Sequence, residues 1–371
     1  MISVYIQSPK WVFRPRNTDW RYTRFMIPRI SEFIPDCRFY PAQSGIETLR
    51  SNWRVARSVL YRNLKISQRQ NYESILDRKE FFRSGCDAVF CHDGFPKNAQ
   101  SIPVIWQNSI LDPEMSIAYG RTKGQIAIEC EMKREGFVES AAVQVSTEAE
   151  RVRLGGLFPD IADKFVAIPF FLPGVIPIEP MALEEKNSRD GQLRFLFVGH
   201  EARRKGLTRV YAAMERLPDS IRKRIHLTVV SRFSDGAIRV PPFPNIQIVG
   251  EASHGRVMHL MRESDVFLMP SYFESYGFVF LEAMAQGTVP VVPNWEVQRE
   301  IVDHGKAGVI TSGDADDLAH SFERLCDERD WRAQLSANAN RRYLEHYTPS
   351  VVAAKYGLLF RQFSRFNSKV I

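Results

Sequence analysis

The sequence lacks the features of a membrane protein, a disulfide scaffold and a zinc protein. No apolar run approaches the ~20 residues of a transmembrane helix, and the longest candidate, Phe165 to Ile178, is interrupted by three prolines. The five cysteines are odd in number and lack metal-ligand spacing, which indicates reduced thiols in a cytoplasmic protein. The N-terminal run Ile2 to Ile6 has no basic region or cleavage site, so we expect a first strand rather than a signal peptide.

The sequence also offers no evident side-chain nucleophile and no set of histidines with metal-ligand spacing. The acidic run Asp314-Ala-Asp316-Asp317 resembles a metal-binding Asp-x-Asp. It precedes a predicted late helix, however, and acidic residues are favoured at helix N-termini. We therefore expect neither a metal nor a cofactor.

A length of 371 residues favours two domains, and 44% hydrophobic with 25% charged residues is typical of globular proteins. Short β-rich runs alternate with helical patterns, which predicts α/β units with parallel sheets. A proline-rich and then polar stretch, residues 171–192, has the composition of a linker. We expect an N-terminal domain over 1–170, completed by a C-terminal helix within 351–371, and a second domain over 193–350. The expected strands are Ser3–Gln7, Ala88–Cys91, Val104–Trp106, Ala142–Val145 and Phe165–Ile168, then Arg194–Val198, His226–Val230, Ile246–Val249, Val266–Met269, Val289–Val292 and Gly308–Thr311.

The positive charge gathers at the N-terminal end. The chain carries a net +7, yet residues through Arg83 hold 16 Lys and Arg against 7 Asp and Glu. An anionic partner and a solvated basic surface both explain this asymmetry. Within it, Arg50 to Phe82 is predicted to be mostly helical and rich in arginine. A membrane-surface helix, a clamp for a phosphorylated acceptor and an ordinary amphipathic covering helix remain open.

The most informative stretch runs from Val266 to Ala285. An apolar run predicts a buried strand, a short loop carries Glu274, and Gly277 leads into a helix that carries Glu282. The start of a helix favours an anion such as phosphate. Carboxylates beside it would repel that anion, so sugar or ribose hydroxyls are their natural partners. Phosphate and sugar together indicate a sugar nucleotide.

A second anion-binding element is expected at Gly199 to Gly206, where glycines bracket a basic loop between a strand and a helix. Arg204 and Lys205 suit a diphosphate, since arginine offers a planar fork and lysine a point charge. Because the preceding strand opens the second sheet, this loop can reach the loop that carries Glu274.

These motifs, with Pro270-Ser271, Gly287 and Pro290 to Val292, resemble the retaining glycosyltransferases of family 4, also described as group 1 glycosyltransferases. The resemblance covers Arg194 to about Tyr347, whereas the first 168 residues match only in layout. It implies the GT-B fold, in which two Rossmann-like domains face each other across a cleft and the C-terminal helix crosses back to the N-terminal domain.

The resemblance also implies roles for individual residues. Arg204 and Lys205 would hold the diphosphate, Glu274 would face the donor sugar, and Glu282 would bind the ribose. The segment from Val249 to Ala252 would lie against the base. The implied catalytic residues are Arg204, Lys205 and Glu274, and the implied donor-binding residues are Gly199, Gly250, Glu251, Ser275, Tyr276, Gly277, Phe278, Val279, Phe280 and Glu282.

The chain departs from the family pattern in three places. His200 follows Gly199 where many members have arginine, the loop after the first strand has no glycine, and no histidine follows Val104 to Trp106. The candidates on the acceptor side are therefore His92, Asp93, Asn108, Lys10 and Arg14.

We expect a metal-independent enzyme that moves a hexose-like sugar from a nucleoside diphosphate, UDP before GDP, to a glycan, a lipid-linked or another hydroxyl acceptor. Such an activity would belong to polysaccharide biosynthesis in the cytoplasm, and peripheral contact with the inner membrane face through the basic N-terminal domain stays open. A sugar-nucleotide epimerase or phosphorylase of the same fold is one alternative. A non-catalytic module for sugar nucleotides or nucleic acid is another, although the sequence shows no nucleic-acid motif.

Overall fold

The computed structural model of the chain describes residues 2–7, 30, 32–34, 37–41, 73–75, 87–92, 95–97, 103–107, 113–118, 120–232 and 238–363. The chain forms two compact units. The first comprises Met1–Pro113, Arg121–Pro173 and Pro349–Ile371, and the second comprises Glu114–Gly120 and Gly174–Thr348.

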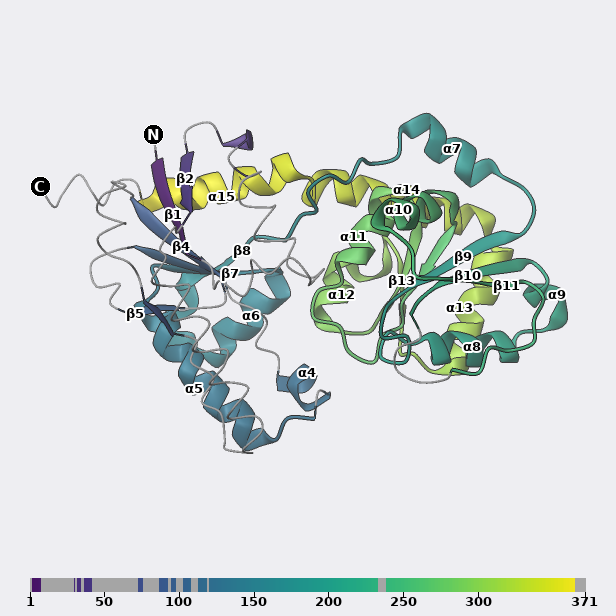
Figure 1. Ribbon diagram of the computed structural model, residues 1–371, viewed down its shortest axis with the longest axis horizontal. Coiled ribbons are helices and arrows are strands. Elements are labelled where there is room, and N and C mark those ends of the chain that lie inside the picture. Colours follow the sequence, from purple (N-terminus) through teal and green to yellow (C-terminus); the bar gives the residue numbers. More distant parts are fainter. Residues whose placement is uncertain are drawn as a thin grey trace, which may run out of the picture. The chain divides into compact units, whose positions relative to one another are not determined.

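The first unit holds a six-stranded parallel sheet with the order β2-β1-β4-β6-β7-β8 (Figure 1). Its strands are β1 (Ile2–Gln7), β2 (Cys37–Pro41), β4 (Ala88–His92), β6 (Val104–Gln107), β7 (Ala142–Val145) and β8 (Phe165–Ala167). The other elements in this part of the chain are β3 (Glu73–Ile75), β5 (Phe95–Lys97), α4 (Pro113–Ala118), α5 (Lys123–Glu139), α6 (Glu148–Leu157) and the 3-10 helix η3 (Pro159–Lys164). The five strands expected here are confirmed, and β2 is an addition. Strand β3 interrupts the stretch predicted to be mostly helical, and the rest of Arg50 to Phe82 lies outside the described residues.

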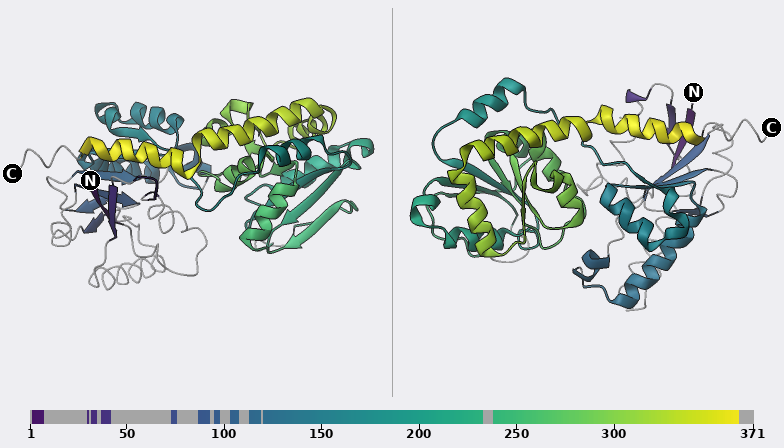
Figure 2. Two further views of the ribbon diagram at one scale, coloured as in Figure 1. Left: turned by 90° about the horizontal axis from the view of Figure 1, so that it is seen from above. Right: turned by 180° about the vertical axis from the view of Figure 1, so that it is seen from behind.

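The last helix, α15 (Pro349–Phe363), belongs to the first unit. It lies beside β1 (Figure 2), and its buried face packs on the sheet. Tyr356 and Phe360 make edge-to-face contacts with Phe90 of β4, with ring centroids 5.8 and 6.1 Å apart. Aromatic pairs of this geometry stabilise a core beyond the area that they bury.

The second unit is a doubly wound sheet with the order β11-β10-β9-β12-β13-β14, in which every strand pair is parallel. The strands are β9 (Leu193–Val198), β10 (Ile225–Val230), β11 (Ile246–Gly250), β12 (Val266–Leu268), β13 (Val289–Pro293) and β14 (Val309–Thr311). The helices are α7 (Pro180–Ser188), α8 (Leu207–Arg216), α9 (Asp219–Arg222), α10 (His254–Glu263), α11 (Phe278–Ala285), α12 (Glu296–Ile301), α13 (Ala315–Asp327) and α14 (Arg329–His346), with the 3-10 turn η4 (Asp303–Gly305). In chain order the sheet reads 3-2-1-4-5-6, the order of dinucleotide-binding folds. All six expected strands of this unit are confirmed.

The apolar pattern of β9 explains how this sheet buries both faces. Phe195 and Phe197 are fully buried in the core cluster that α8 and α13 complete, and Phe195 contacts Phe322 of α13 edge to face at 5.2 Å. On β12, the ring of Phe267 contacts that of Phe280 of α11 edge to face, with ring centroids 5.9 Å apart. Since both faces are covered, the strands read as continuous apolar runs rather than alternating ones.

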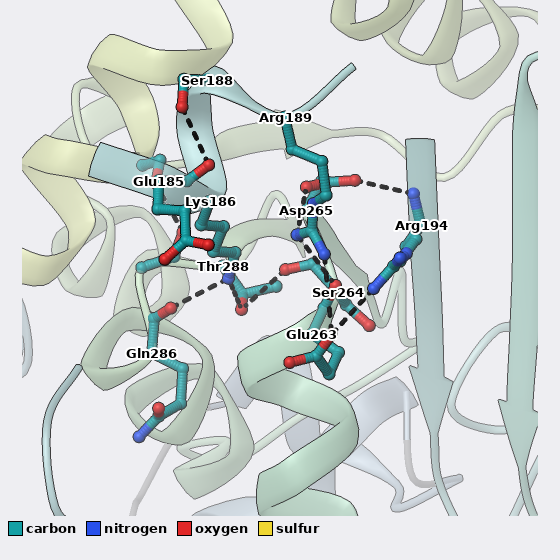
Figure 3. A network of polar contacts seen from close by, with 12 residues as sticks. Glu185, Lys186, Ser188, Arg189, Arg194, Glu263, Ser264, Asp265, Gln286 and Thr288 are labelled. Atoms are coloured by element: carbon teal, nitrogen blue, oxygen red, sulfur yellow. Dashed lines mark hydrogen bonds and ion pairs between the residues drawn. The ribbon is translucent and has the colours of Figure 1, made fainter. Parts of the chain in front are cut away.

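The segment predicted as a linker contains helix α7, which is a correction. Its Lys186 is only 7% exposed, and the ammonium donates to Gln286 O at 2.9 Å and to Thr288 Oγ1 at 2.8 Å (Figure 3). Thr288 Oγ1 in turn donates to Met261 O at 2.5 Å. Burial lowers the pKa of Lys186 to about 7. The polar composition of this stretch therefore marks a helix anchored to the second unit by one buried lysine.

Candidate functional site

The topology of the second unit brings two of the predicted motifs together. Strands β9 and β12 are neighbours at the centre of the sheet, where the strand order reverses. The loop after β9 is the basic loop Gly199 to Gly206, and the loop after β12 leads to Glu274. Ligands of open α/β sheets bind at such a switch point, outside the carboxyl ends of the strands.

The basic loop is closely packed against the loop after β12. Gly206 has φ +89°, and a Cβ at this position would lie 2.2 Å from Pro270 O. Only glycine adopts this conformation readily and leaves room for the carbonyl. The backbone N–H of Tyr272 also donates to Arg204 O at 2.9 Å. The two loops therefore form one rigid element.

Glu274 lies among the predicted cations of the basic loop. Its side chain is 9% exposed; Lys205 Nζ donates to its Oε2, and Arg204 Nη1 lies 3.9 Å from the same oxygen. Arg204 Nη1 also donates to Phe273 O at 3.2 Å. The structure thus brings together Arg204, Lys205 and Glu274, whose catalytic roles stay predictions. All three side chains lie within the second unit, and the two cations neutralise Glu274 directly.

Arg209, the first-turn arginine of α8, is a further member of this element that the sequence did not single out. Its Nη1 donates to Pro270 O at 3.0 Å and to Ser271 O at 3.3 Å, and its guanidinium stacks 3.7 Å from the centre of the Tyr272 ring. Gly313 (φ +84°) leaves room for it, since a Cβ there would lie 2.3 Å from Arg209 Nη1. Arg209 therefore fixes the backbone that precedes Glu274.

Helix α11 begins at Phe278, as the glycine at 277 predicted. Gly277 has φ +85°, and a Cβ there would lie 2.5 Å from the Phe280 ring and 3.3 Å from Glu274 Cγ. The first N–H groups of the helix lack partners inside it and attract negative charge. The fully buried Gln298 of α12 donates to Tyr276 O at 2.8 Å and so holds this loop from behind. Gln298 is another supporting residue that the sequence analysis missed.

Glu282 projects from α11 and is 12% exposed; its Oε1 lies 2.8 Å from His254 Nε2, on the first residue of α10. The C-terminal end of α11 is held by Lys186 of α7, because the backbone carbonyl of Gln286 accepts a hydrogen bond from the Lys186 ammonium. Asn340 Nδ2 donates to the neighbouring Ala285 O at 2.9 Å. The carboxylate therefore sits on a helix whose two ends are both fixed.

The predicted base segment leads from β11 into α10. Gly250 has φ +75°, and Glu251 forms an exposed ion pair with Arg232. The hydrogen bond from Arg232 lowers the pKa of Glu251, and His200 adds a smaller contribution in the same direction. His200, whose role the sequence left open, therefore lies near Glu251.

The acceptor-side candidates are not brought together by the described residues. His92 ends strand β4, and Asp93, Asn108, Lys10 and Arg14 lie outside the described residues.

The acidic run near residue 314 serves the start of α13. Asp314 caps it by accepting from Asp316 N at 2.9 Å, and Asp317 accepts from Thr311 Oγ1 at 2.7 Å and Ser312 N at 2.8 Å. Among the described residues, no group of three or more His, Cys, Asp or Glu side chains could hold a metal ion. No helix in the described ranges combines the length and hydropathy needed to cross a membrane.

Comparison with known proteins matches the second unit to a family. Residues 181–342 match the family model described as glycosyl transferases group 1. A phosphatidyl-myo-inositol mannosyltransferase of Mycolicibacterium smegmatis is 28% identical over 185 residues, which are 47% of this chain and 46% of the relative. The match therefore spans less than half of that relative.

Two solved structures resemble the chain along nearly its whole length. Sucrose-phosphate synthase from Thermosynechococcus elongatus superposes with a TM-score of 0.63 at 16% identity and covers 100% of both chains. Anabaena Alr3699/HepE, solved in complex with UDP and glucose, gives a TM-score of 0.60 at 13% identity and covers 98% of this chain and 100% of its own. At these identities the likeness shows the fold. The expected GT-B class, with two parallel-sheet α/β domains, is confirmed.

Proposed function

We propose that the chain is a group 1 glycosyltransferase that moves a sugar from a nucleoside diphosphate to a hydroxyl acceptor. One observation carries the proposal: the basic loop, Glu274 and the start of α11 meet at the switch point of a sheet that matches the group 1 family model. UDP is favoured over GDP as the nucleotide, because UDP is common in the family that the chain resembles and HepE was solved with UDP and glucose.

The mechanism follows from where negative charge develops. As the bond between the anomeric carbon and the diphosphate oxygen breaks, charge accumulates on the leaving diphosphate. In the proposed mechanism Arg204, Lys205 and the N–H groups at the start of α11 would stabilise that charge. Each preorganised donor of this kind lowers the activation free energy of the chemical step by about 3–4 kcal/mol.

We infer retention of configuration at the anomeric carbon. A bond then forms from the acceptor oxygen to the anomeric carbon, on the face that the diphosphate leaves. The proton of the acceptor hydroxyl passes to an oxygen of the leaving diphosphate, so no side-chain base is required. Glu274 positions the sugar hydroxyls rather than attacking the sugar.

The acceptor is proposed as a hydroxyl of a glycan or of a lipid-linked molecule, with the first unit as its binding domain. The mannosyltransferase relative is named for a phosphatidylinositol acceptor, which supports the lipid class. The basic N-terminal segment would then favour an anionic membrane surface on the cytoplasmic side.

Donor binding gives the first prediction. A sugar nucleotide at 100 times its dissociation constant should raise the free energy of unfolding by ~2.7 kcal/mol. Thermal melts of the full chain against UDP- and GDP-sugars are expected to show a clear rise for at least one donor. Glu282→Gln should lower the affinity for that donor about tenfold, because a neutral amide is a poorer acceptor for ribose hydroxyls. The exposed Glu215→Gln on α8 is the matched control and should leave affinity unchanged. If no donor shifts the melt at millimolar concentration, the proposal is wrong.

A further inference from the structure

His254 stands outside every motif that the sequence indicated, yet it contacts a residue at the centre of the proposed site. It is the first residue of α10, and its Nε2 lies 2.8 Å from Glu282 Oε1 on α11. The two side chains are 42% and 12% exposed. One contact thus joins the segment that follows β11 to the carboxylate proposed to bind the ribose.

Stability does not explain this contact. A pair with a half-exposed partner contributes little to folding, because solvent screens the charges and two side chains must be held in place. Helix α10 is already held by its buried face, in which Val257 is 8% and Met261 0% exposed. Met261 O also accepts the hydrogen bond from Thr288. The pair is therefore better explained by what it does to the Glu282 carboxylate.

The surroundings of Glu282 show what that effect is. Its Oε1 is occupied by His254, and within the described residues its Oε2 has no hydrogen bond. The fully buried Tyr343 of α14 lies near this carboxylate: burial raises the pKa of its phenol, and the charge of Glu282 adds a smaller contribution in the same direction. Tyr343 Oη has no hydrogen-bond partner among the described residues. One oxygen of the carboxylate is thus fixed, and the other can accept.

We propose that His254 is a positioning residue of the nucleoside site. By holding Oε1, it fixes the Glu282 side chain so that Oε2 accepts from a ribose hydroxyl. It also ties the segment from Val249 to Ala252, proposed to lie against the base, to the residue that contacts the sugar ring of the nucleoside. The ligand class that this pair selects is a ribonucleotide rather than a deoxyribonucleotide. The inference rests on the proposed function, since it assigns a role within the same site.

The test compares UDP with 2′,3′-dideoxy-UDP, which lacks the hydroxyls, by isothermal titration calorimetry on the full chain. The wild type should bind UDP about tenfold more tightly than the dideoxy analogue, the effect of one lost charge-assisted hydrogen bond. His254→Ala should lose most of that preference, because its affinity for UDP falls while its affinity for the dideoxy analogue is unchanged. It should raise the KM for the sugar nucleotide about tenfold while leaving kcat within about twofold, because the ribose is bound equally in the ground and transition states.

His254→Gln is the conservative variant. Its side-chain amide can donate from near the position of Nε2, so most of the preference for UDP should return. The exposed His259→Ala, about one and a half turns along the same helix, is the matched control and should behave as wild type. A folded His254→Ala that keeps the full preference for UDP overturns the inference, and so does a folded His254→Gln that restores none of it. Wild-type protein that binds no nucleotide at all overturns the proposed function instead.

Discussion

Lys205→Met is expected to lower sugar transfer by about 10²–10³, the usual effect of removing one fixed donor from a developing charge. In the structure the Lys205 ammonium donates to Glu274 Oε2, and a bound diphosphate would compete for the same cation. The loss should lie in diphosphate binding and not in nucleoside binding. Calorimetry of the variant should therefore show a weaker affinity for UDP and an unchanged affinity for uridine. The rate at which the sugar nucleotide is cleaved to UDP should fall as stated above.

Two further variants separate this role from a structural one. Lys205→Arg keeps the charge and should recover part of the affinity for UDP, although a planar fork replaces a point charge. Lys306→Met removes an exposed lysine that also has a carboxylate partner, Asp303 at 3.4 Å, and should have no effect. If Lys205→Met lowers the affinities for uridine and UDP alike and also lowers the free energy of unfolding, Lys205 supports the loop and does not bind phosphate.

The second large effect concerns Lys186. Its pKa is about 7 in the folded chain because burial disfavours the ammonium, against 10.5 for an exposed lysine. Below pH 7 both states hold the proton, and the cost of the buried charge is largest. Between pH 7 and 10.5 the native state loses the proton while the unfolded state keeps it, so stability rises with pH. From pH 7 to pH 9 this rise amounts to about 2 kcal/mol.

Lys186→Met removes this dependence. Urea unfolding at pH 7 and pH 9 should show the wild type gaining about 2 kcal/mol relative to the variant as pH rises. Subtracting the variant cancels the other titrating groups, so the difference isolates Lys186. Lys223→Met, which removes an exposed lysine, is the control and should run parallel to the wild type. A wild-type stability that stays parallel to that of Lys186→Met would mean that the lysine is charged in the folded state at both pH values.

Much of the second unit could be predicted because its sequence is locally consistent. The strands around Phe195, Leu227 and Val291 are continuous apolar runs, as sheets covered on both faces require. Helix α7 was missed because its nine residues have no apolar stripe, and it is anchored by Lys186 through contacts with residues about 100 positions away. A buried lysine and a linker lysine look alike in sequence, since only tertiary packing decides the difference.

The residues of the candidate site also fall into those with a local sequence signal and those without one. Gly206, Gly277, Lys205 and Glu274 carry local signals, a glycine or a charge at a strand-to-helix junction, and the structure brings them together. The supporting residues Arg209, Gln298 and His254 carry none. Each lies in an ordinary helical context, and its role appears only where a second helix or loop meets it. These residues orient the site without forming any spacing that sequence could reveal.

The proposed activity depends on cleavage of the bond between the sugar and the diphosphate of a nucleotide sugar. Phosphorus and proton NMR of the full chain, incubated with the donor that stabilises it most, detect this cleavage directly. We expect UDP, or the corresponding diphosphate, to accumulate and the sugar to leave first with its anomeric configuration retained, whereas Lys205→Met should release the diphosphate about 10²–10³ more slowly. An epimerised but intact donor, release of the monophosphate with a sugar phosphate, or tight binding without turnover in the presence of hydroxyl acceptors would each contradict it.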